Sequence, residues 1–409
     1  MLEYHTATLP SGLRIVQQFN DSPVAFCGFM VDCGTRNEDG PAEFGLAHFI
    51  EHILFKGTRK RDAWHINQRM ESVGGELNAY TTKEDTTFYC TFLSEDFPRA
   101  CELLCDLLFN ATAPQHELVK EQEVVIDEIV SYRDNPSELI YDVFENQLFA
   151  GTPLGHNILG SEQTVRSFDH DRCLGFIRRN YRPECMVFFC YGNIPWPKVL
   201  ASVEKNARPA SPSIADLAQA APSGLAPIEA ETTETPYHQS HCMLGCRTYP
   251  YGHPNAAALA LINNILGGPS MNSRLNQQLR EKNGLVYTVE SSVTPFTDTG
   301  YFSIYFGCDH EDRDRCLRLC RRELQRIATQ PLSPRQLQSA QKQFLGQLGI
   351  GQANLENNAL ALAKRILRFG RIESLEETAA RIQAVTSAQL QQVASELFTD
   401  DRLLTVVLK

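Results

Sequence analysis

The segment His48-Phe49-Ile50-Glu51-His52 is the stretch from which the rest of this chain can be interpreted. Successive residues of an α-helix are rotated by about 100°, so positions four apart lie on one face. His48 and His52 therefore share a face, and Glu51 borders it. The neighbouring residues are mostly apolar, and Gly57 is a typical helix stop. The pattern predicts one helix that presents two imidazoles and a carboxylate together.

This H-x-x-E-H order is the inverse of the H-E-x-x-H motif found in many zinc peptidases. A single histidine on an apolar helix is more often a structural core residue than a ligand. Three ionisable groups are costly to bury together without a partner, and a divalent cation is the simplest partner. We therefore predict His48 and His52 as metal ligands and Glu51 as the general base that acts on water.

A catalytic zinc ion commonly takes three protein ligands, so one more is expected. A long helix is predicted after Pro114, over 117–129, and it is rich in glutamate. Glu121 and Glu128 lie seven positions apart and share one face of that helix. From these residues alone, a solvated acidic face explains them as well as a metal site does.

The motif and the distant Glu128 together resemble the inverzincin peptidases of the pitrilysin type, family M16. The most similar branch comprises the mitochondrial-processing-peptidase-like proteins and their short bacterial two-domain relatives. The resemblance extends over nearly the whole chain, through further segments in the order of the family: 74–79, 266–268, 273–275 and 279–287.

The resemblance implies one Zn²⁺ per chain, bound by His48, His52 and Glu128. It also implies that Glu51 activates water and that Glu121 supports the site as part of the catalytic set. The choice between the two interpretations of the acidic helix is therefore made by the resemblance.

Substrate contacts are implied in the same way. The alternating pattern over 73–80 and 86–92 predicts a hairpin, and an edge strand can bind a peptide as an added strand. By resemblance, Asn78 and Ala79 lie along that edge. Arg280 and Tyr287 match the arginine and tyrosine that the family's second domain brings to the substrate. As sequence alone, Arg280 beside Glu281 indicates a surface ion pair.

The two halves of the chain resemble each other. The segment 27–35 is similar to 242–248, and 95–105 is similar to 311–320. Both halves are predicted to run strand, helix, hairpin, helix. We therefore predict an α+β fold of two homologous α/β domains, each a mainly antiparallel sheet flanked by helices. The expected boundaries are 1–206 for the catalytic domain, 207–229 for an extended Ala/Pro/Ser-rich linker and 230–409 for the second domain.

The second domain is expected to lack a metal site. Matching the two helices places Ala260, Asn263 and Asn264 opposite the histidines and glutamate of the motif. Its expected role is to contribute substrate contacts.

Composition limits the class of protein. The 409 residues are 43% hydrophobic and 21% charged, which is typical of soluble globular proteins. The net charge of −11 argues against a nucleic-acid partner, and no apolar stretch is long enough to span a membrane. The first residues resemble no targeting signal. Thirteen cysteines without a C-x-x-C pair favour a reducing cytoplasm, in a bacterium by resemblance.

These observations favour a zinc-dependent endopeptidase that hydrolyses unfolded or short peptides, including presequence-like ones. The alternative is a noncatalytic or partner-dependent subunit of a heterodimeric peptidase with the same fold. A small-molecule metalloenzyme on a related fold is a third interpretation, but the strand edge and the pair Arg280 and Tyr287 favour a peptide over a small ligand. The resemblance further implies a homodimer, or a heterodimer with a noncatalytic relative.

Overall fold

The computed structural model describes residues 4–207, 231–233 and 237–409. Apart from Ala207, the predicted linker at 207–229 lies outside these residues. Two compact units form. Unit 1 comprises Met1–Ser131, His156–Ala218 and Asn354–Ile372, and unit 2 comprises Tyr132–Gly155, Gln219–Ala353 and Glu373–Lys409.

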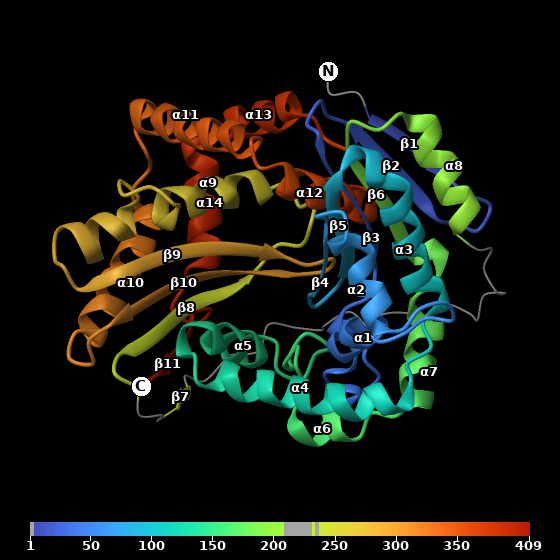
Figure 1. Ribbon diagram of the computed structural model, residues 1–409. Coiled ribbons are helices and arrows are strands. Elements are labelled where there is room, and N and C mark those ends of the chain that lie inside the picture. The colour runs from blue at the N-terminus through green and yellow to red at the C-terminus, as the bar shows by residue number, and fades with distance from the viewer. Residues whose placement is uncertain (1–3, 208–230, 234–236) are drawn as a thin grey trace. The chain divides into compact units, whose positions relative to one another are not determined.

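Unit 1 is built on a six-stranded sheet of order β1-β2-β6-β3-β5-β4 (Figure 1). All neighbouring strands are antiparallel except β2 and β6. The strands are β1 (Tyr4–Thr8), β2 (Arg14–Phe19), β3 (Val24–Val31), β4 (Glu76–Thr81), β5 (Thr86–Leu93) and β6 (Met186–Gly192). The central strands β3 and β6 are almost continuously apolar and buried, as expected for strands covered on both faces. Strand β4 lies at one end of the sheet.

The helices of unit 1 include the motif helix and the long acidic helix. They are α1 (Leu46–Leu54), α2 (Ala63–Glu71), α3 (Phe97–Asn110), α4 (Gln115–Arg133), α6 (Glu162–Arg166), α7 (His170–Asn180), α8 (Trp196–Asn206) and α12 (Leu355–Phe369). Helix α4 ends in unit 2, since Tyr132 and Arg133 belong there. The predicted helices around the motif and after Pro114 and the predicted hairpin are all present.

Unit 2 has a five-stranded sheet of order β7-β11-β8-β10-β9, in which only β7 and β11 are parallel (Figure 1). Its strands are β7 (Glu231–Thr233), β8 (Ser240–Thr248), β9 (Val286–Pro295), β10 (Gly300–Cys308) and β11 (Leu404–Leu408). Its helices are α5 (Pro136–Leu148), α9 (Ala256–Gly267), a π-helix over Asn276–Glu281, α10 (Arg313–Thr329), α11 (Pro334–Gly351), α13 (Leu375–Ala384) and α14 (Ser387–Leu397).

The internal repeat is confirmed by the order of elements. Unit 1 runs β3, α1, the β4–β5 hairpin and α3, while unit 2 runs β8, α9, the β9–β10 hairpin and α10. Each sheet is mainly antiparallel and carries helices on its faces, so the predicted α+β class holds. Helix α9 is the counterpart of α1, and it carries Ala260, Asn263 and Asn264 where α1 carries the two histidines and the glutamate of the motif.

Each unit also contains one helix from the other half of the sequence. Helix α12 packs Leu362 and Ile366 against Phe26 and Phe189 of the unit 1 sheet. Helix α5 packs on the unit 2 sheet through Ile140, Phe144 and Leu148.

Local geometry shows how closely α5 fits. A Cβ atom at Gly245 of β8 would lie 2.8 Å from the Phe144 ring, so the missing side chain makes room for this ring.

Because each unit includes a helix from the other half of the sequence, the packing units are discontinuous in sequence. The predicted domain boundaries, 1–206 and 230–409, divide the chain into contiguous segments. They do not include the exchange of α5 and α12 between the two units.

A buried arginine ties α12 to the sheet of unit 1. The Arg368 side chain is 4% exposed; its Nη1 lies 2.5 Å from Asp32 Oδ1 and its Nη2 lies 3.0 Å from Asp85 Oδ2. It also donates to the carbonyl oxygen of Glu84, at 3.2 Å. Asp85 is fully buried, so it depends on this guanidinium and on Lys364 for its charge partners.

We expect Arg368→Ala to lower the free energy of unfolding of unit 1 by about 3 kcal/mol, because it leaves a buried carboxylate without its main partner. Chemical denaturation followed by circular dichroism measures the change. Arg365→Ala, an exposed position on the same helix, serves as the control and should change stability by less than about 0.5 kcal/mol. If both variants lowered the free energy of unfolding equally, the stabilising role of the Arg368 ion pairs would be contradicted.

Candidate metal centre

Helix α1 brings the two histidines of the motif onto one face. Their ring centroids are 4.6 Å apart, and the rings are inclined by 63°. His48 is buried, whereas His52 is partly exposed. The helix forms because its residues are apolar on the side that packs into unit 1, where Leu46, Phe49 and Ile53 are fully buried.

Helix α4 supplies the third member of the group. Glu128 Oε1 lies 3.7 Å from His48 Nε2, and Glu128 Oε2 lies 3.6 Å from His52 Nε2. Ligands about 2.0–2.2 Å from a tetrahedral zinc ion are about 3.4 Å from one another. Within the described residues, this is the only group of three or more histidine, cysteine or acidic side chains close enough to hold a metal ion. Two imidazole nitrogens and a carboxylate oxygen therefore fit zinc in both chemistry and spacing.

The electrostatics of the group also favour a cation. Burial, followed by the neighbouring His52, lowers the pKa of His48 to about 3, so this imidazole is neutral near pH 7. Burial raises the pKa of Glu128 above that of an ordinary glutamate. His48 Nδ1 is buried and makes no hydrogen bond to any of the described residues. A bound divalent cation would offset the cost of burying these groups.

Glu121 lies behind His52 and fixes its tautomer. His52 Nδ1 donates to Glu121 Oε1 at 2.8 Å, which leaves the lone pair of Nε2 directed at the metal group. Glu121 Oε2 lies 2.7 Å from Lys56 Nζ. Burial alone would raise the pKa of Glu121, but its hydrogen bonds with His52 and Lys56 lower it. Burial opposes protonation of His52, yet Glu121 and the other carboxylates raise its pKa on balance.

Glu51 is close to the same group but is held by a different partner. Thr81 Oγ1, at the end of β4, donates to Glu51 Oε2 at 2.6 Å. Burial raises the pKa of Glu51, and the hydrogen bond from Thr81 opposes that rise. Glu51 is therefore a partly desolvated carboxylate with one oxygen engaged.

The structure thus brings together five of the residues singled out from the sequence: His48, Glu51, His52, Glu121 and Glu128. Their chemical roles stay predictions. Thr81 and Lys56 were missed as contacts of the site. Lys56 lies four positions after His52, a spacing that could have suggested it, whereas the Thr81 contact depends on how the hairpin packs against α1.

Asn78 and Ala79 lie in β4, opposite Tyr89 and Phe88 of β5. β4 is the last strand of its sheet, and no strand of the described chain pairs with its outer side. The predicted edge is therefore present, and α1 packs against this strand. Binding of a substrate there remains a prediction.

Arg280 and Tyr287 lie in unit 2. Arg280 is the last residue but one of the π-helix and Tyr287 is the second residue of β9; the guanidinium carbon of Arg280 lies 5.6 Å from the centre of the tyrosine ring. Tyr287 is 85% exposed. Arg280 Nε also lies 3.8 Å from Glu281 Oε1, which matches the surface ion pair indicated by sequence alone. The two side chains form a pair, and their action on a substrate stays a prediction.

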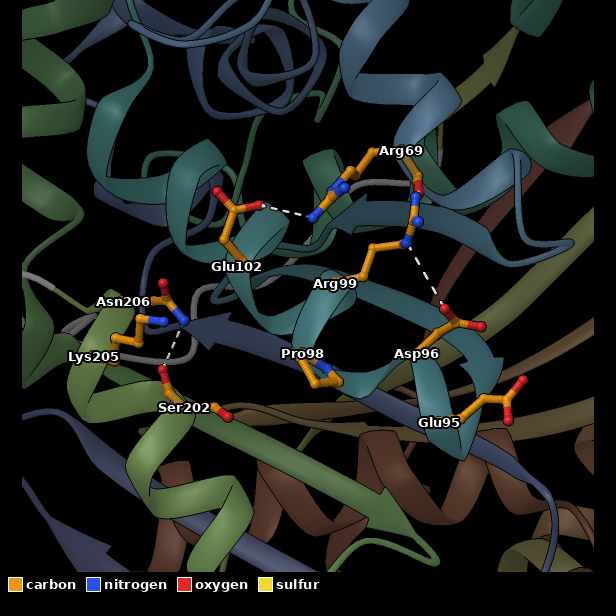
Figure 2. A pocket seen from close by; sticks show the side chains of 9 residues that line it. All are labelled: Arg69, Glu95, Asp96, Pro98, Arg99, Glu102, Ser202, Lys205 and Asn206. Carbon is orange, nitrogen blue, oxygen red and sulfur yellow. Dashed lines mark hydrogen bonds and ion pairs between the residues drawn. The ribbon is translucent and has the colours of Figure 1, made fainter.

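Unit 1 also has a cavity of about 390 Å³ that none of these residues lines. Figure 2 shows its polar lining, in which Arg69 faces Glu102 and Arg99 faces Asp96. The lining residues are Arg69, Glu95, Asp96, Pro98, Arg99, Glu102, Ser202, Lys205 and Asn206. Because its charges are of both signs and largely paired with one another, this cavity has no evident ligand.

An H-x-x-E-H helix with a distant glutamate, on a duplicated α/β fold, defines the inverzincin class of proteins. Comparison with known families agrees with this class. Residues 14–162 match the model described as insulinase (peptidase family M16), and residues 167–344 match the one described as the peptidase M16 inactive domain.

Individual relatives extend the match over nearly the whole chain. An uncharacterised zinc protease of Streptomyces coelicolor is 33% identical, over 98% of this chain and 88% of its own length. The uncharacterised zinc protease YmxG of Bacillus subtilis is 30% identical, over 98% of this chain and 97% of its own. The chain belongs to peptidase family M16.

Solved structures show the same fold. The peptidase M16 inactive domain from Pseudomonas fluorescens superposes with a TM-score of 0.89, at 20% identity, over 100% of this chain and 98% of that one. A protease from Helicobacter pylori superposes with a TM-score of 0.87 at 19% identity, with full coverage of both chains.

In the described part of the chain, no helix is long and apolar enough to cross a membrane.

We expect Glu121→Gln to weaken zinc binding by about 10- to 100-fold, because the neutral amide no longer makes His52 a stronger base. Competition with a chromophoric chelator measures the dissociation constant. Glu123→Gln is the matched control on the same helix: Glu123 is exposed and pairs with Arg166, so this change should leave the constant unaltered. Unchanged affinity in Glu121→Gln would contradict the supporting role of Glu121.

Proposed function

We propose that this protein is a zinc-dependent endopeptidase that hydrolyses peptide bonds in unfolded or short peptides, including presequence-like ones. One observation carries the proposal. Three ligand groups are gathered at metal-binding distances, and a fourth ionisable group, Glu51, lies beside them with a different hydrogen-bond partner. A purely structural zinc site would be closed by a fourth ligand and would not need such a carboxylate.

The proposed roles follow from the contacts. His48, His52 and Glu128 would hold one zinc ion per chain, which supplies a Lewis acid at this position. Glu51 accepts a proton from the attacking water and delivers it to the leaving amine nitrogen. The hydrogen bond from Thr81 occupies Oε2, which leaves Oε1 as the oxygen for this transfer. Glu121 keeps His52 in the tautomer that can bind metal.

A peptide substrate is favoured by the strand beside the motif helix. The outer edge of β4, with Asn78 and Ala79, offers backbone donors and acceptors to an extended chain. Such pairing requires the substrate to be extended, so folded proteins are excluded and many sequences are accepted. Arg280 and Tyr287 would provide a cation and a phenolic donor to the substrate carbonyl oxygen as negative charge develops there.

We further propose that the protein acts in the cytoplasm of a bacterium as a homodimer. Support comes from the family resemblance and from the bacterial origin of the relatives. A heterodimer with a noncatalytic relative, or a role as a partner-dependent subunit, is the competing proposal.

The test is cleavage of a mixed set of unstructured peptides of about 10 to 30 residues, with products identified by mass spectrometry. Wild-type protein is compared with metal-stripped protein, zinc-restored protein and Glu51→Gln. We expect cleavage to disappear on stripping, to return with zinc and to fall at least about 1000-fold in Glu51→Gln, since the proton acceptor is lost.

Glu51→Gln should still bind zinc, because Glu51 is not among the three ligand groups. A wild-type protein that binds one zinc ion but cuts nothing would favour the partner-dependent subunit. A wild-type protein that binds no metal would refute the proposal itself.

Tyr287→Phe tests the contribution of unit 2. We expect kcat to fall about 100-fold with KM nearly unchanged, because a hydrogen bond to the developing negative charge is lost. Zinc affinity should not change, since Tyr287 lies outside the metal group. Tyr4→Phe, which removes the hydroxyl of another exposed tyrosine, should leave both constants alone. Wild-type kcat in Tyr287→Phe would rule out this role.

A further inference from the structure

The N-terminus of the motif helix is capped in an unusual way. The N-cap residue of α1 is Gly45, which has no side chain to accept from the first backbone N–H groups. Glu38 takes over this function. Its Oε2 accepts from Gly45 N at 3.1 Å, and its Oε1 accepts from Ala47 N at 2.8 Å. Ala47 immediately precedes His48.

Glu38 is itself held in place. It is 8% exposed, and its Oε2 lies 2.8 Å from His156 Nε2. The imidazole of His156 stacks on the ring of Phe44, with centroids 3.8 Å apart and planes inclined by 6°. Lys83 Nζ donates to the carbonyl oxygen of His156. A carboxylate fixed by so many contacts can fix the helix that it caps.

The backbone around the cap is equally close. A Cβ atom at Gly160 would lie 2.3 Å from the Phe44 carbonyl oxygen, and one at Gly45 would lie 2.6 Å from the Leu159 carbonyl oxygen. Both glycines have positive φ, at 71° and 95°. The segment 156–160 therefore lies directly against the start of α1, and side chains cannot be accommodated between them.

The same contacts reach the hairpin that holds Glu51. Lys83 belongs to the turn between β4 and β5, two residues after Thr81, which donates to Glu51. His156 thus contacts both Glu38, which holds α1, and Lys83, which holds the turn. One residue is therefore in contact with groups that belong to the start of α1 and to the turn after β4.

We propose that Glu38, held by His156, is a positioning residue for the metal centre. Glu38 fixes the position of α1 along the helix axis and its rotation about that axis. His48 is thereby placed beside Glu128, and Glu51 within hydrogen-bond distance of Thr81. A carboxylate is suited to this place because the helix N-terminus carries partial positive charge. The part of this inference that concerns catalysis rests on the proposed peptidase function, whereas the part that concerns metal affinity does not.

A positioning role and a merely structural role predict different results. Loss of a structural carboxylate lowers stability but leaves the zinc affinity of the folded molecules unchanged. Loss of a positioning carboxylate misplaces the ligands, so zinc affinity falls even where the protein is fully folded. It also lowers kcat more than it raises KM, because Glu51 is misplaced while the substrate strand remains.

The experiment measures the zinc dissociation constant of the full chain by chelator competition, well below the thermal unfolding midpoint, for wild type, Glu38→Ala, Glu38→Gln and His156→Asn. We expect Glu38→Ala to raise the constant at least about tenfold. Glu38→Gln keeps one acceptor oxygen and should recover part of the loss. His156→Asn should give a smaller change in the same direction, and it decides the test if Glu38→Ala does not fold.

Asp106→Asn is the control. Asp106 is also a buried carboxylate of unit 1, and its partners Thr58, Arg61 and Asn110 lie outside α1. It should lower the unfolding midpoint without changing zinc affinity. The inference is overturned if folded Glu38→Ala binds zinc within twofold of wild type, or if Asp106→Asn weakens zinc binding equally.

The kinetic comparison adds a second reading on the same variants. We expect kcat for peptide cleavage to fall at least about tenfold in Glu38→Ala, with KM within about twofold of wild type. If wild type binds zinc but cleaves no peptide, the proposed function fails, and the affinity measurements alone still decide the role of Glu38.

Discussion

The cost of burying ionisable groups is the constraint on which the metal centre depends. Unit 1 gathers two imidazoles and three carboxylates on α1 and α4, in surroundings that shift the pKa values of most of them away from their ordinary range. Two of the carboxylates have partners of their own: Glu121 contacts His52 and Lys56, and Glu51 accepts from Thr81. The three that face one another, His48, His52 and Glu128, share the position where a cation fits. His48, Glu51 and His52 therefore have different partners although they lie on neighbouring turns of α1.

A second constraint concerns the sheets. A sheet of apolar strands has two faces, and both must be covered. In unit 1, α3 packs on the sheet from within the same half of the chain, and α12 arrives from the second half. In unit 2, helix α5 from the first half of the chain packs on the five-stranded sheet. The internal repeat describes how the sequence arose as two similar halves, while the packing divides the chain differently.

Much of the centre could be predicted because it depends on local geometry. The spacing of His48 and His52 places them on one helical face wherever the helix lies, and the alternation after Gly75 defines β4 and β5. Glu128 could be selected over other glutamates only by the family resemblance, since its distance from the motif is set by the tertiary fold. Thr81 and Glu38 escaped prediction for the same reason: a threonine at a strand end and a glutamate before a helix have no pattern that names their partners. The exchange of α5 and α12 between the halves could not be predicted from composition or periodicity. A helix has the same kind of apolar face whether it packs on a sheet from its own half of the sequence or on a sheet from the other half.

The exchange of α12 has a consequence for how the chain reaches its native state. The ribosome synthesises the first half of the chain long before residues 355–369, so one face of the unit 1 sheet is not covered by α12 until late in synthesis. Val16, Phe26 and Phe189 then stay in contact with water, or with whatever apolar surface is nearby, until the last part of the chain has been made. Contacts between residues so far apart in sequence are slow to form, because a long loop must close first. The six strands of the unit 1 sheet, all within residues 4–192, are therefore made early, whereas the helix that covers one face of the sheet is made only near the end of synthesis. A gene fragment that encodes the first half alone would give a polypeptide with all three predicted metal ligands and an uncovered, aggregation-prone sheet.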